Sequence, residues 1–466
     1  MTLSTKAVTM VKKDRQKKAL LAYPPISLSR GWEGSLPFLE NLVCLGSYLK
    51  NNGVETIVFH EHPYSMANFI EIIRQKKPAV VCISVDSANF DSCYYMAEIV
   101  KKITPDCLTI LGGIHATFFD IKILEHVPFV DMIVRGEGEV TLQEILDIME
   151  ENYHPSYKQV LGITYRDQGK ICKNADRPVI ADLDTLPFFS YELLDMDEIE
   201  ADSWPGCYAI HTGRGCSFPC HFCADRAIWN RNYRCKSPGR ILEEIKYCRD
   251  HYPINGIFFG NDTFTANKVK TRELCELLIQ ENIGIDWCCS TRVDCLDDDL
   301  LVLMKKSGCR MIAYGVESLS DIMLQHMKKN YSAALAMKVL RKSNELGIDT
   351  RFNLIFGYPG ETEQTLKETL TNITQLDPAI ICKSAALYQL HPGSGFYNDA
   401  KEKGWIKDES WFTGYKMEHF FDLYHPPEFA RKVAACRDAV LRRYEESLQE
   451  RYPLTRRNLH RRQVQV

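Results

Sequence analysis

The chain has 466 residues, of which 45% are hydrophobic and 25% are charged, and its formal net charge is −4. This is the composition of a globular protein with two or three domains, and the small net charge gives no general reason to expect nucleic-acid binding. The sequence has no run of about 20 apolar residues, so it predicts no transmembrane helix. Residues 1–18 are polar and basic and lack the apolar core of a secretory signal, so we predict a disordered leader on a cytoplasmic protein.

Residues 19–151 alternate between strand-like and helix-like segments. We predict strands at 18–23, 54–59, 79–85, 108–113 and 131–136, and helices near 38–51, 65–76 and 90–103. The strands are apolar along their whole length, which is typical of parallel strands buried on both faces. This pattern predicts an α/β domain with a doubly wound, Rossmann-like sheet, in which ligands bind beyond the carboxyl ends of the strands.

Three of those strand ends carry residues that suit a ligand. They are Ser84 and Asp86, then Gly112, Gly113 and His115, and then Gly136 and Glu137. Paired glycines after a strand let the backbone approach a large ligand closely, and a tight strand-to-helix turn is the alternative for each loop. Residues 152–206, which follow, are predicted to be a linker with a small hairpin and an extended crossing.

Cys216, Cys220 and Cys223 form a C-x3-C-x2-C triplet, and Phe222 directly precedes the last cysteine. Three thiolates at this spacing can hold three irons of a [4Fe–4S] cluster and leave the fourth iron open. A zinc site is the alternative, and its fourth ligand would come from the nearby residues His211, His221 or Cys235.

The chain contains 18 cysteines and no secretory signal, so we predict reduced thiols in a low-oxygen cytosol and not disulfides. Most cysteines outside the triplet lie in apolar runs, where they act as small buried hydrophobic residues. A second cluster at Cys288, Cys289 and Cys295 is an alternative, although the sequence has no further C-x2-C pair.

Residues 207–395 repeat a strand–helix unit. We predict strands at 208–213, 256–260, 285–290, 309–317, 350–357 and 380–390, and helices that include 238–251 and 333–346. Six such units make a partial (β/α)6 barrel of the TIM type, whose chemistry gathers at the carboxyl ends of the strands. Residues 396–466 are predicted to form a small α-rich region, with an aromatic stretch that packs internally or covers the barrel mouth.

The candidate ligand contacts of the barrel are Gly260, Asn261, Asp262, Ser290, Arg292, Glu317, Arg351, Gly357 and Leu390. Asn261 and Asp262 can accept hydrogen bonds from an ammonium group. Glu317 suits ribose hydroxyls or an ion pair with Arg292, and a plain salt-bridged strand end is the alternative. The aspartates between 294 and 299 are predicted to form a helix cap and not a metal site.

The segment HTGRGCSFPCHFCAD at 211–225 resembles the signature of the radical S-adenosylmethionine (SAM) superfamily, C-x3-C-x-aromatic-C. The resemblance implies that Cys216, Cys220 and Cys223 bind a [4Fe–4S] cluster whose open iron takes the amino and carboxylate groups of SAM. One electron then cleaves SAM to methionine and a 5′-deoxyadenosyl radical. It also implies that Phe222 and the barrel residues named above contact SAM.

The order of Ser84, the Gly112–Gly113 pair and the loop at 135–139 resembles the B12-binding (cobalamin-binding) domain found ahead of many radical SAM domains. It implies that the seven loop residues named for this region contact cobalamin. The sequence departs from the usual pattern because no Asp-x-His-x-x-Gly loop follows the first strand, and His60 and His62 follow the second. Cobalamin would therefore lack a lower histidine ligand.

The two resemblances together imply a cobalamin-dependent radical SAM enzyme, either a methyltransferase of class B or a protein like the anaerobic Mg-protoporphyrin cyclases. Our leading hypothesis is methylation of an unactivated carbon in a small molecule or peptide, with flavodoxin or ferredoxin as the electron donor. The first alternative is a non-methylating reaction such as cyclisation, oxidation, epimerisation or carbon–carbon bond formation. RNA modification is disfavoured, and a corrinoid- or zinc-binding protein without enzymatic activity is the remaining alternative.

Overall fold

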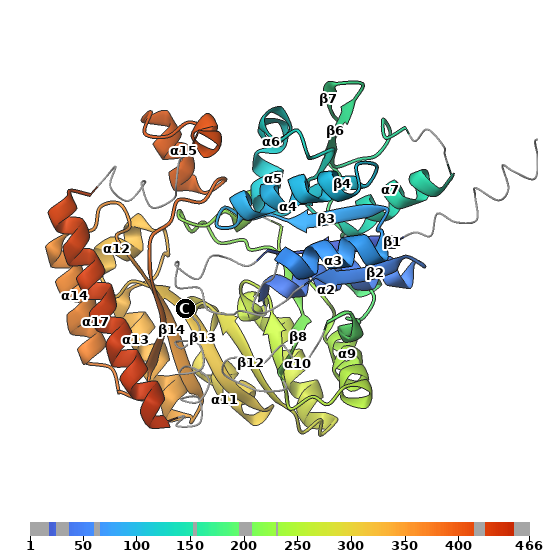
Figure 1. Cartoon of the computed structure of the whole chain (residues 1–466). Helices are drawn as coiled ribbons and strands as arrows, with labels where there is room; N and C mark the ends of the chain where they lie inside the picture. The colour runs from blue at the N-terminus through green and yellow to red at the C-terminus, as the bar shows by residue number, and fades with distance from the viewer. Residues whose placement is uncertain are drawn as a thin grey trace, which may run out of the picture. The chain divides into compact units, whose positions relative to one another are not determined.

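The computed structural model describes residues 18–24, 37–59, 66–151, 156–194, 207–229, 232–413 and 425–451. Almost all of the predicted leader, His60, His62 and the aromatic residues between 414 and 424 lie outside this part. The chain divides into two compact units (Figure 1). The first unit comprises Met1–Ala209, Ala227–Asn230 and Ile406–Gly414, and the second comprises Ile210–Arg226, Arg231–Trp405 and Tyr415–Val466.

The sheet of the first unit has the strand order β2-β1-β3-β4-β5-β6-β7. Its parallel part consists of β1 (Lys18–Ala22), β2 (Glu55–Phe59), β3 (Val80–Ser84), β4 (Leu108–Gly112) and β5 (Met132–Val134). All five strands were predicted within two residues, because strands that are buried on both faces are apolar without interruption. The predicted doubly wound sheet is confirmed.

The helices of this unit are α2 (Pro37–Asn51), α3 (Met66–Lys76), α4 (Phe90–Ile103), α5 (Ile114–Phe118), α6 (Asp120–His126) and α7 (Glu139–Glu151). Helix α3 packs against α4, and α2 packs against α7. The chain moves from β1 outward to β2 and then back past β1 to β3. Because such crossovers are right-handed, these two helix pairs lie on opposite faces of the sheet. The strand order thus reverses between β1 and β3, and open α/β sheets bind ligands at such a point.

The hairpin predicted in the linker consists of β6 (Ile163–Asp167) and β7 (Lys170–Lys173), and it extends the sheet of the first unit. Strand β6 runs antiparallel to β5. The buried Arg135 holds the hairpin, since its guanidinium donates to Thr164 Oγ1 at 2.5 Å and to Asp176 Oδ1 at 2.7 Å. The short 3-10 helices η2 (Leu183–Thr185) and η3 (Tyr191–Leu193) follow.

A segment from near the end of the chain completes the first unit. The 3-10 helix η6 (Asp408–Phe412) places Trp411, which is 2% exposed, among Phe90, His115 and Phe119. Glu409 of this helix forms an ion pair with Lys122 at 3.1 Å. The predicted internal packing of these aromatic residues is therefore observed for Trp411, but against partners about 300 residues earlier in the chain.

The sheet of the second unit has the order β15-β14-β13-β12-β11-β8, as the six predicted barrel strands require. The strands are β8 (Cys207–His211), β11 (Gly256–Gly260), β12 (Asp286–Thr291), β13 (Cys309–Glu317), β14 (Asp349–Phe356) and β15 (Ile381–Leu387). The pairs from β11 to β15 are parallel. A short antiparallel pair, β9 (Gly213–Arg214) and β10 (Arg234–Cys235), flanks the cysteine loop.

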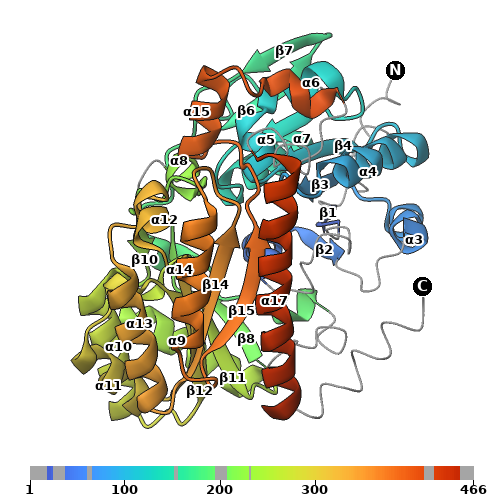
Figure 2. The same ribbon diagram turned by 90° about the vertical axis from the view of Figure 1, so that its left-hand side faces the viewer.

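The helices that alternate with these strands are α8 (Asp225–Ile228), α9 (Pro238–His251), α10 (Lys268–Gln280), α11 (Asp298–Lys306), α12 (Asp321–His326), α13 (Ala333–Glu345), α14 (Glu363–Thr374) and α15 (Gly395–Glu402). The turns η4 (Phe264–Ala266) and η5 (Val293–Cys295) follow β11 and β12. Asp297 caps α11, as predicted, by accepting from Leu300 N. The long helix α17 (Pro427–Arg451) packs against β15 and α14 and covers the last strand of the open barrel (Figure 2). Within the described residues, no helix has the length and apolarity needed to cross a bilayer.

Candidate functional site

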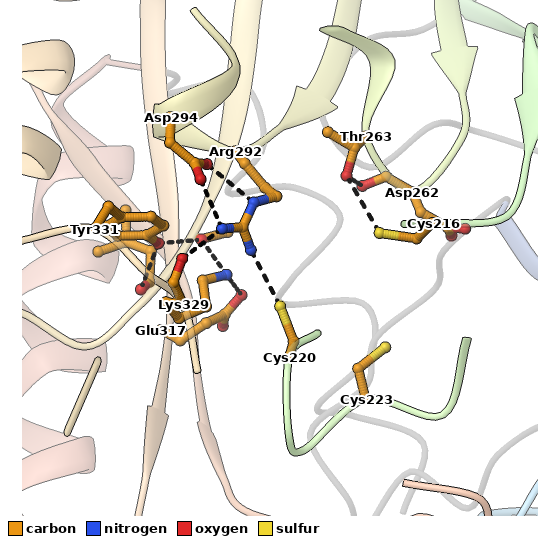
Figure 3. A network of polar contacts seen from close by, with 12 residues as sticks. Cys216, Cys220, Cys223, Asp262, Thr263, Arg292, Asp294, Glu317, Lys329 and Tyr331 are labelled. Carbon is orange, nitrogen blue, oxygen red and sulfur yellow. Dashed lines mark hydrogen bonds and ion pairs between the residues drawn. The ribbon is translucent and has the colours of Figure 1, made fainter. Parts of the chain in front are cut away.

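The three cysteines of the triplet lie on one loop between β9 and α8 (Figure 3). Each sulfur has a different polar neighbour. Cys216 Sγ is 4.0 Å from Thr263 Oγ1, Cys220 Sγ accepts from Arg292 at 3.1 Å, and Cys223 Sγ donates to Asp225 at 3.2 Å. Burial raises the pKa of the Cys216 and Cys223 thiols. These thiols therefore stay protonated at neutral pH until a metal displaces the proton.

The triplet suits a cluster better than a single ion. In the described part of the chain, no three His, Cys, Asp or Glu side chains converge on one point where a metal ion would fit. A [4Fe–4S] cluster binds its thiolates at separate corners, so it matches sulfurs that are spread around a loop. Of the ligands weighed for zinc, His221 is already engaged: its Nδ1 lies 3.0 Å from the Tyr358 hydroxyl and its Nε2 lies 3.5 Å from Asp399.

His221 ties the cysteine loop to three other segments of the second unit. Its backbone N–H donates to Met327 O at 3.0 Å, and its carbonyl accepts from Phe396 N at 3.0 Å. The glycine at 395 makes room for the ring, because a Cβ there would stand 2.2 Å from His221 Cδ2. The sequence pattern gave no sign of this anchoring role, which depends on residues more than 100 positions away.

Polar atoms without partners, on Asn261 just after β11 and on Asn353 within β14, point to a polar ligand in the second unit. Both amide atoms of Asn261 and the amide oxygen of Asn353 are buried and make no hydrogen bond to any described residue. Leaving such atoms unpaired is costly, and native proteins pair nearly all of them. A ligand with donors and acceptors, such as the amino and carboxylate groups of SAM, would satisfy them.

Arg292 is the central cation of this region and is only 5% exposed. Its Nε and Nη2 each donate to Asp294 at 2.9 Å, and its Cζ lies 4.0 Å above the Phe218 ring. The ion pair between Arg292 and Glu317 that the sequence suggested is not the one formed. Glu317 instead pairs with the buried Lys329 at 3.3 Å.

Glu317 adopts a left-handed backbone conformation, with φ of 67°. A non-glycine residue rarely adopts such a φ, and such strain collects at functional sites. Lys329 also donates to Gly315 O at 2.8 Å, and Tyr331 donates to the same carbonyl at 3.0 Å. Sequence reasoning missed Phe218, Lys329 and Tyr331, because nothing in their local pattern distinguishes them from packing residues.

The other residues predicted to contact SAM occupy varied positions. Gly260 ends β11, Ser290 lies near the end of β12, and Leu390 is fully buried after β15. Phe222 makes an edge contact with Tyr358, with ring centroids 6.5 Å apart.

Gly357 follows β14 in a turn and has φ of 73°. Its backbone N–H donates to the Glu361 carboxylate, and its carbonyl accepts from His425 Nε2 at 3.0 Å. Burial raises the pKa of Glu361 to about 7. Asp262 follows Asn261 in the turn after β11. Arg351 lies in the first half of β14 and donates to Asp349 at 2.8 Å, so the structure does not bring it to the strand ends.

The ligand contacts predicted for the first unit follow β3, β4 and β5, whose carboxyl ends lie beside that of β1 in the sheet. The Tyr23 hydroxyl, just after β1, donates to Asp86, just after β3. Ser84 is the last residue of β3, and Glu137 accepts from Ile180 N at 2.6 Å.

The glycines of this edge leave room for a large group. Gly136 is exposed, and a Cβ built on it would meet nothing within 4 Å. Gly112 is nearly as open, whereas a Cβ at Gly113 would stand 2.7 Å from Val85 O. An edge with bare backbone and open space in front fits the approach of a group as large as cobalamin.

His115 differs from its neighbours, because its ring lies inside the unit. The side chain is fully buried, Nδ1 lies 3.0 Å from Ser87 Oγ, and the ring stacks on Phe90. Burial lowers its pKa to about 3. A contact of His115 with cobalamin therefore stays a prediction. In this structure the ring packs inside the unit, against Phe90 and Ser87.

Two models of known protein families match different parts of this chain. The family model of the radical SAM superfamily matches residues 210–373, and the model of the B12 binding domain matches residues 41–146. An uncharacterized methyltransferase of Pyrococcus horikoshii is 30% identical over 313 residues, which cover 67% of this chain and 68% of that protein.

Two further similarities concern a cyclase and a solved structure. The anaerobic magnesium-protoporphyrin IX monomethyl ester cyclase of Rubrivivax gelatinosus is 29% identical over 77% of this chain, which spans 65% of the cyclase's length. The structure of the methyltransferase TsrM of Kitasatospora setae, with cobalamin and a [4Fe–4S] cluster bound, has a TM-score of 0.67 at 16% identity. That match covers 83% of this chain and 75% of TsrM, and at this identity it shows a shared fold.

Proposed function

Because this chain belongs to the radical SAM superfamily and carries a B12-binding domain, we propose that it is a cobalamin-dependent enzyme that methylates an unactivated carbon. The observation that carries the proposal is the open edge of the first unit at Gly112 and Gly136. A chain that only cleaved SAM would not require a second ligand-binding edge. The substrate is proposed to be a small molecule or a peptide.

The residues divide into two sets with separate tasks. In the second unit, Cys216, Cys220 and Cys223 hold the cluster, and the unpaired amides of Asn261 and Asn353 receive polar groups of SAM. In the first unit, the bare backbone at Gly112 and Gly136 lets cobalamin approach the sheet edge. With these groups bound, cluster and SAM supply a 5′-deoxyadenosyl radical, and cobalamin supplies the methyl group.

A second candidate function is a reaction without methyl transfer. The 29% identity to the Rubrivivax gelatinosus cyclase, over 77% of this chain, favours it. Both candidates require a one-electron reductant, for which we propose flavodoxin or ferredoxin, and a cytoplasmic location fits either donor.

The two candidates are separated by loading the enzyme anaerobically with iron, sulfide and hydroxocobalamin, reducing the cluster and the cobalt with titanium(III) citrate, and then supplying SAM labelled in its methyl group. Methylation predicts about four irons and one cobalt per chain and transfer of label to the bound cobalamin. A cobalt-free enzyme that still produces 5′-deoxyadenosine would refute methylation and favour the second candidate. Cys216→Ala, Cys220→Ala and Cys223→Ala should each abolish 5′-deoxyadenosine formation, while a Cys235→Ala control retains it.

A further inference from the structure

Arg292 is held in a fixed orientation by groups of its own unit. A guanidinium has five N–H donors in a rigid plane. Nε and one N–H of Nη2 engage both oxygens of Asp294, at 2.9 Å each, and Nη2 also donates to Lys329 O at 2.6 Å. The planar fork is therefore fixed on two of its three nitrogens, and the direction of Nη1 follows from theirs.

The third nitrogen meets the cysteine loop. Nη1 donates to Cys220 Sγ at 3.1 Å (Figure 3). Arg292 Cζ also lies 4.0 Å above the centroid of the Phe218 ring. Phe218 and Cys220 belong to the same loop, so the cation contacts that loop at two points. Arg292 is 5% exposed, and little water competes for these donors.

A buried donor on a cluster thiolate has an electronic consequence. Hydrogen bonds to the sulfurs and nearby charges are among the factors that set the reduction potential of an iron–sulfur cluster. An added electron makes the cluster and its thiolates more negative, so a cation and an N–H donor stabilise the reduced state more than the oxidised one. Asp294 offsets part of the charge and leaves the hydrogen bond directed at the sulfur.

We propose that Arg292 is a positioning residue that raises the reduction potential of the cluster through its hydrogen bond to Cys220, and that it does not serve as a SAM contact. The inference rests on the proposed cluster site and is independent of whether the enzyme methylates its substrate. The step concerned is the transfer of one electron from an external reductant such as dithionite to the cluster, with no bond made or broken in the protein.

The test compares Arg292→Met, Arg292→Gln and Arg292→Lys with the wild-type full chain, reconstituted with iron and sulfide and titrated anaerobically in the absence of SAM. Methionine and glutamine remove the charge, and we expect the equilibrium constant for one-electron reduction to fall at least tenfold, which is ~59 mV toward more negative potential. Lysine keeps the charge but cannot hold Asp294 and Cys220 together, so a smaller shift in the same direction is expected. Arg310→Gln is the matched control, because it removes an exposed arginine that pairs with Asp286 in the same unit.

Three results would overturn the inference. In the first, the Met and Gln variants retain their iron, and their equilibrium constants for one-electron reduction stay within twofold of the wild-type value. The second is an unchanged potential together with at least tenfold weaker SAM binding, which would make Arg292 a SAM contact. If the Met and Gln variants bind no iron, the lysine variant decides, and a wild-type potential there sinks the proposal. Failure of methylation alone would leave the measured potentials unaffected, so the two proposals fail separately.

Discussion

The hydroxyl of Tyr23 donates a hydrogen bond to the carboxylate of Asp86, 63 residues further along the chain. The two residues follow β1 and β3, between which the strand order of the first unit reverses. Asp86 also accepts from the backbone N–H of Ala88 at 2.6 Å and of Asn89 at 3.1 Å, so the same carboxylate shapes the turn into α4. The contact thus joins the residues that directly follow β1 and β3 at the reversal point, where a cofactor is expected to bind.

We predict that Tyr23→Phe weakens cobalamin binding with a small effect on folding. The substitution removes one hydrogen bond, worth about 1 kcal/mol, while Asp86 keeps its backbone partners. Binding is measured by absorbance titration with hydroxocobalamin and folding by urea denaturation. Tyr95→Phe is the control, because Tyr95 lies on α4 of the same unit and is 54% exposed. Equal affinities for both variants would contradict a role for this contact.

A bulky side chain at Gly136 should block cobalamin without unfolding the first unit. Gly136 has φ of 70° and open space around a Cβ, and Gly53, at the end of α2, has φ of 80° and the same open space. Gly136→Leu and Gly53→Leu therefore carry similar backbone strain, on the order of 1 kcal/mol. Cobalamin affinity should fall at least tenfold only in Gly136→Leu. A matching fall in Gly53→Leu would trace the effect to strain.

The stability of the first unit should depend on pH through His115. Its pKa is lowered to about 3 by burial, whereas an unperturbed histidine titrates near 6.5, so the unfolded chain binds more protons between these values. The free energy of unfolding of the first unit is therefore at its full value above pH 6.5. It decreases as the pH falls, by about 2 kcal/mol at pH 5. His115→Gln should flatten this dependence in urea denaturation, while His126→Gln, at an exposed position, should keep it. If the free energy of unfolding of His115→Gln fell with pH as steeply as that of the wild type, His115 would not be the source of the pH dependence.

Trp411 should contribute strongly to the first unit although it lies near the other end of the chain. Removal of this buried ring from among Phe90, His115 and Phe119 should cost about 3–5 kcal/mol, as for other large core side chains. Trp405→Ala, at a residue 39% exposed, should cost about 1 kcal/mol or less. Fluorescence-detected denaturation measures both. If Trp411→Ala leaves the cobalamin-binding unit unaffected, then η6 does not stabilise that unit.

The sequence by itself determined the parallel strands of the first sheet and the six strands of the second. Strands such as 309–317 and helices such as 238–251 were predicted with the bounds that the structure has, because apolar runs and helical periodicity are local properties of the chain. The cysteine triplet is local as well, since ligands within eight residues share one loop whatever the fold around them.

Only the tertiary structure decided which side chains meet. Arg292 reaches Cys220 across 72 residues, Glu317 pairs with Lys329 and not with Arg292, and Trp411 packs against His115, about 300 residues earlier in the chain. The linker hairpin joined the first sheet for the same reason. Such partners depend on how distant segments pack, and a packing contact between distant residues leaves no periodicity or spacing in either segment from which it could be predicted.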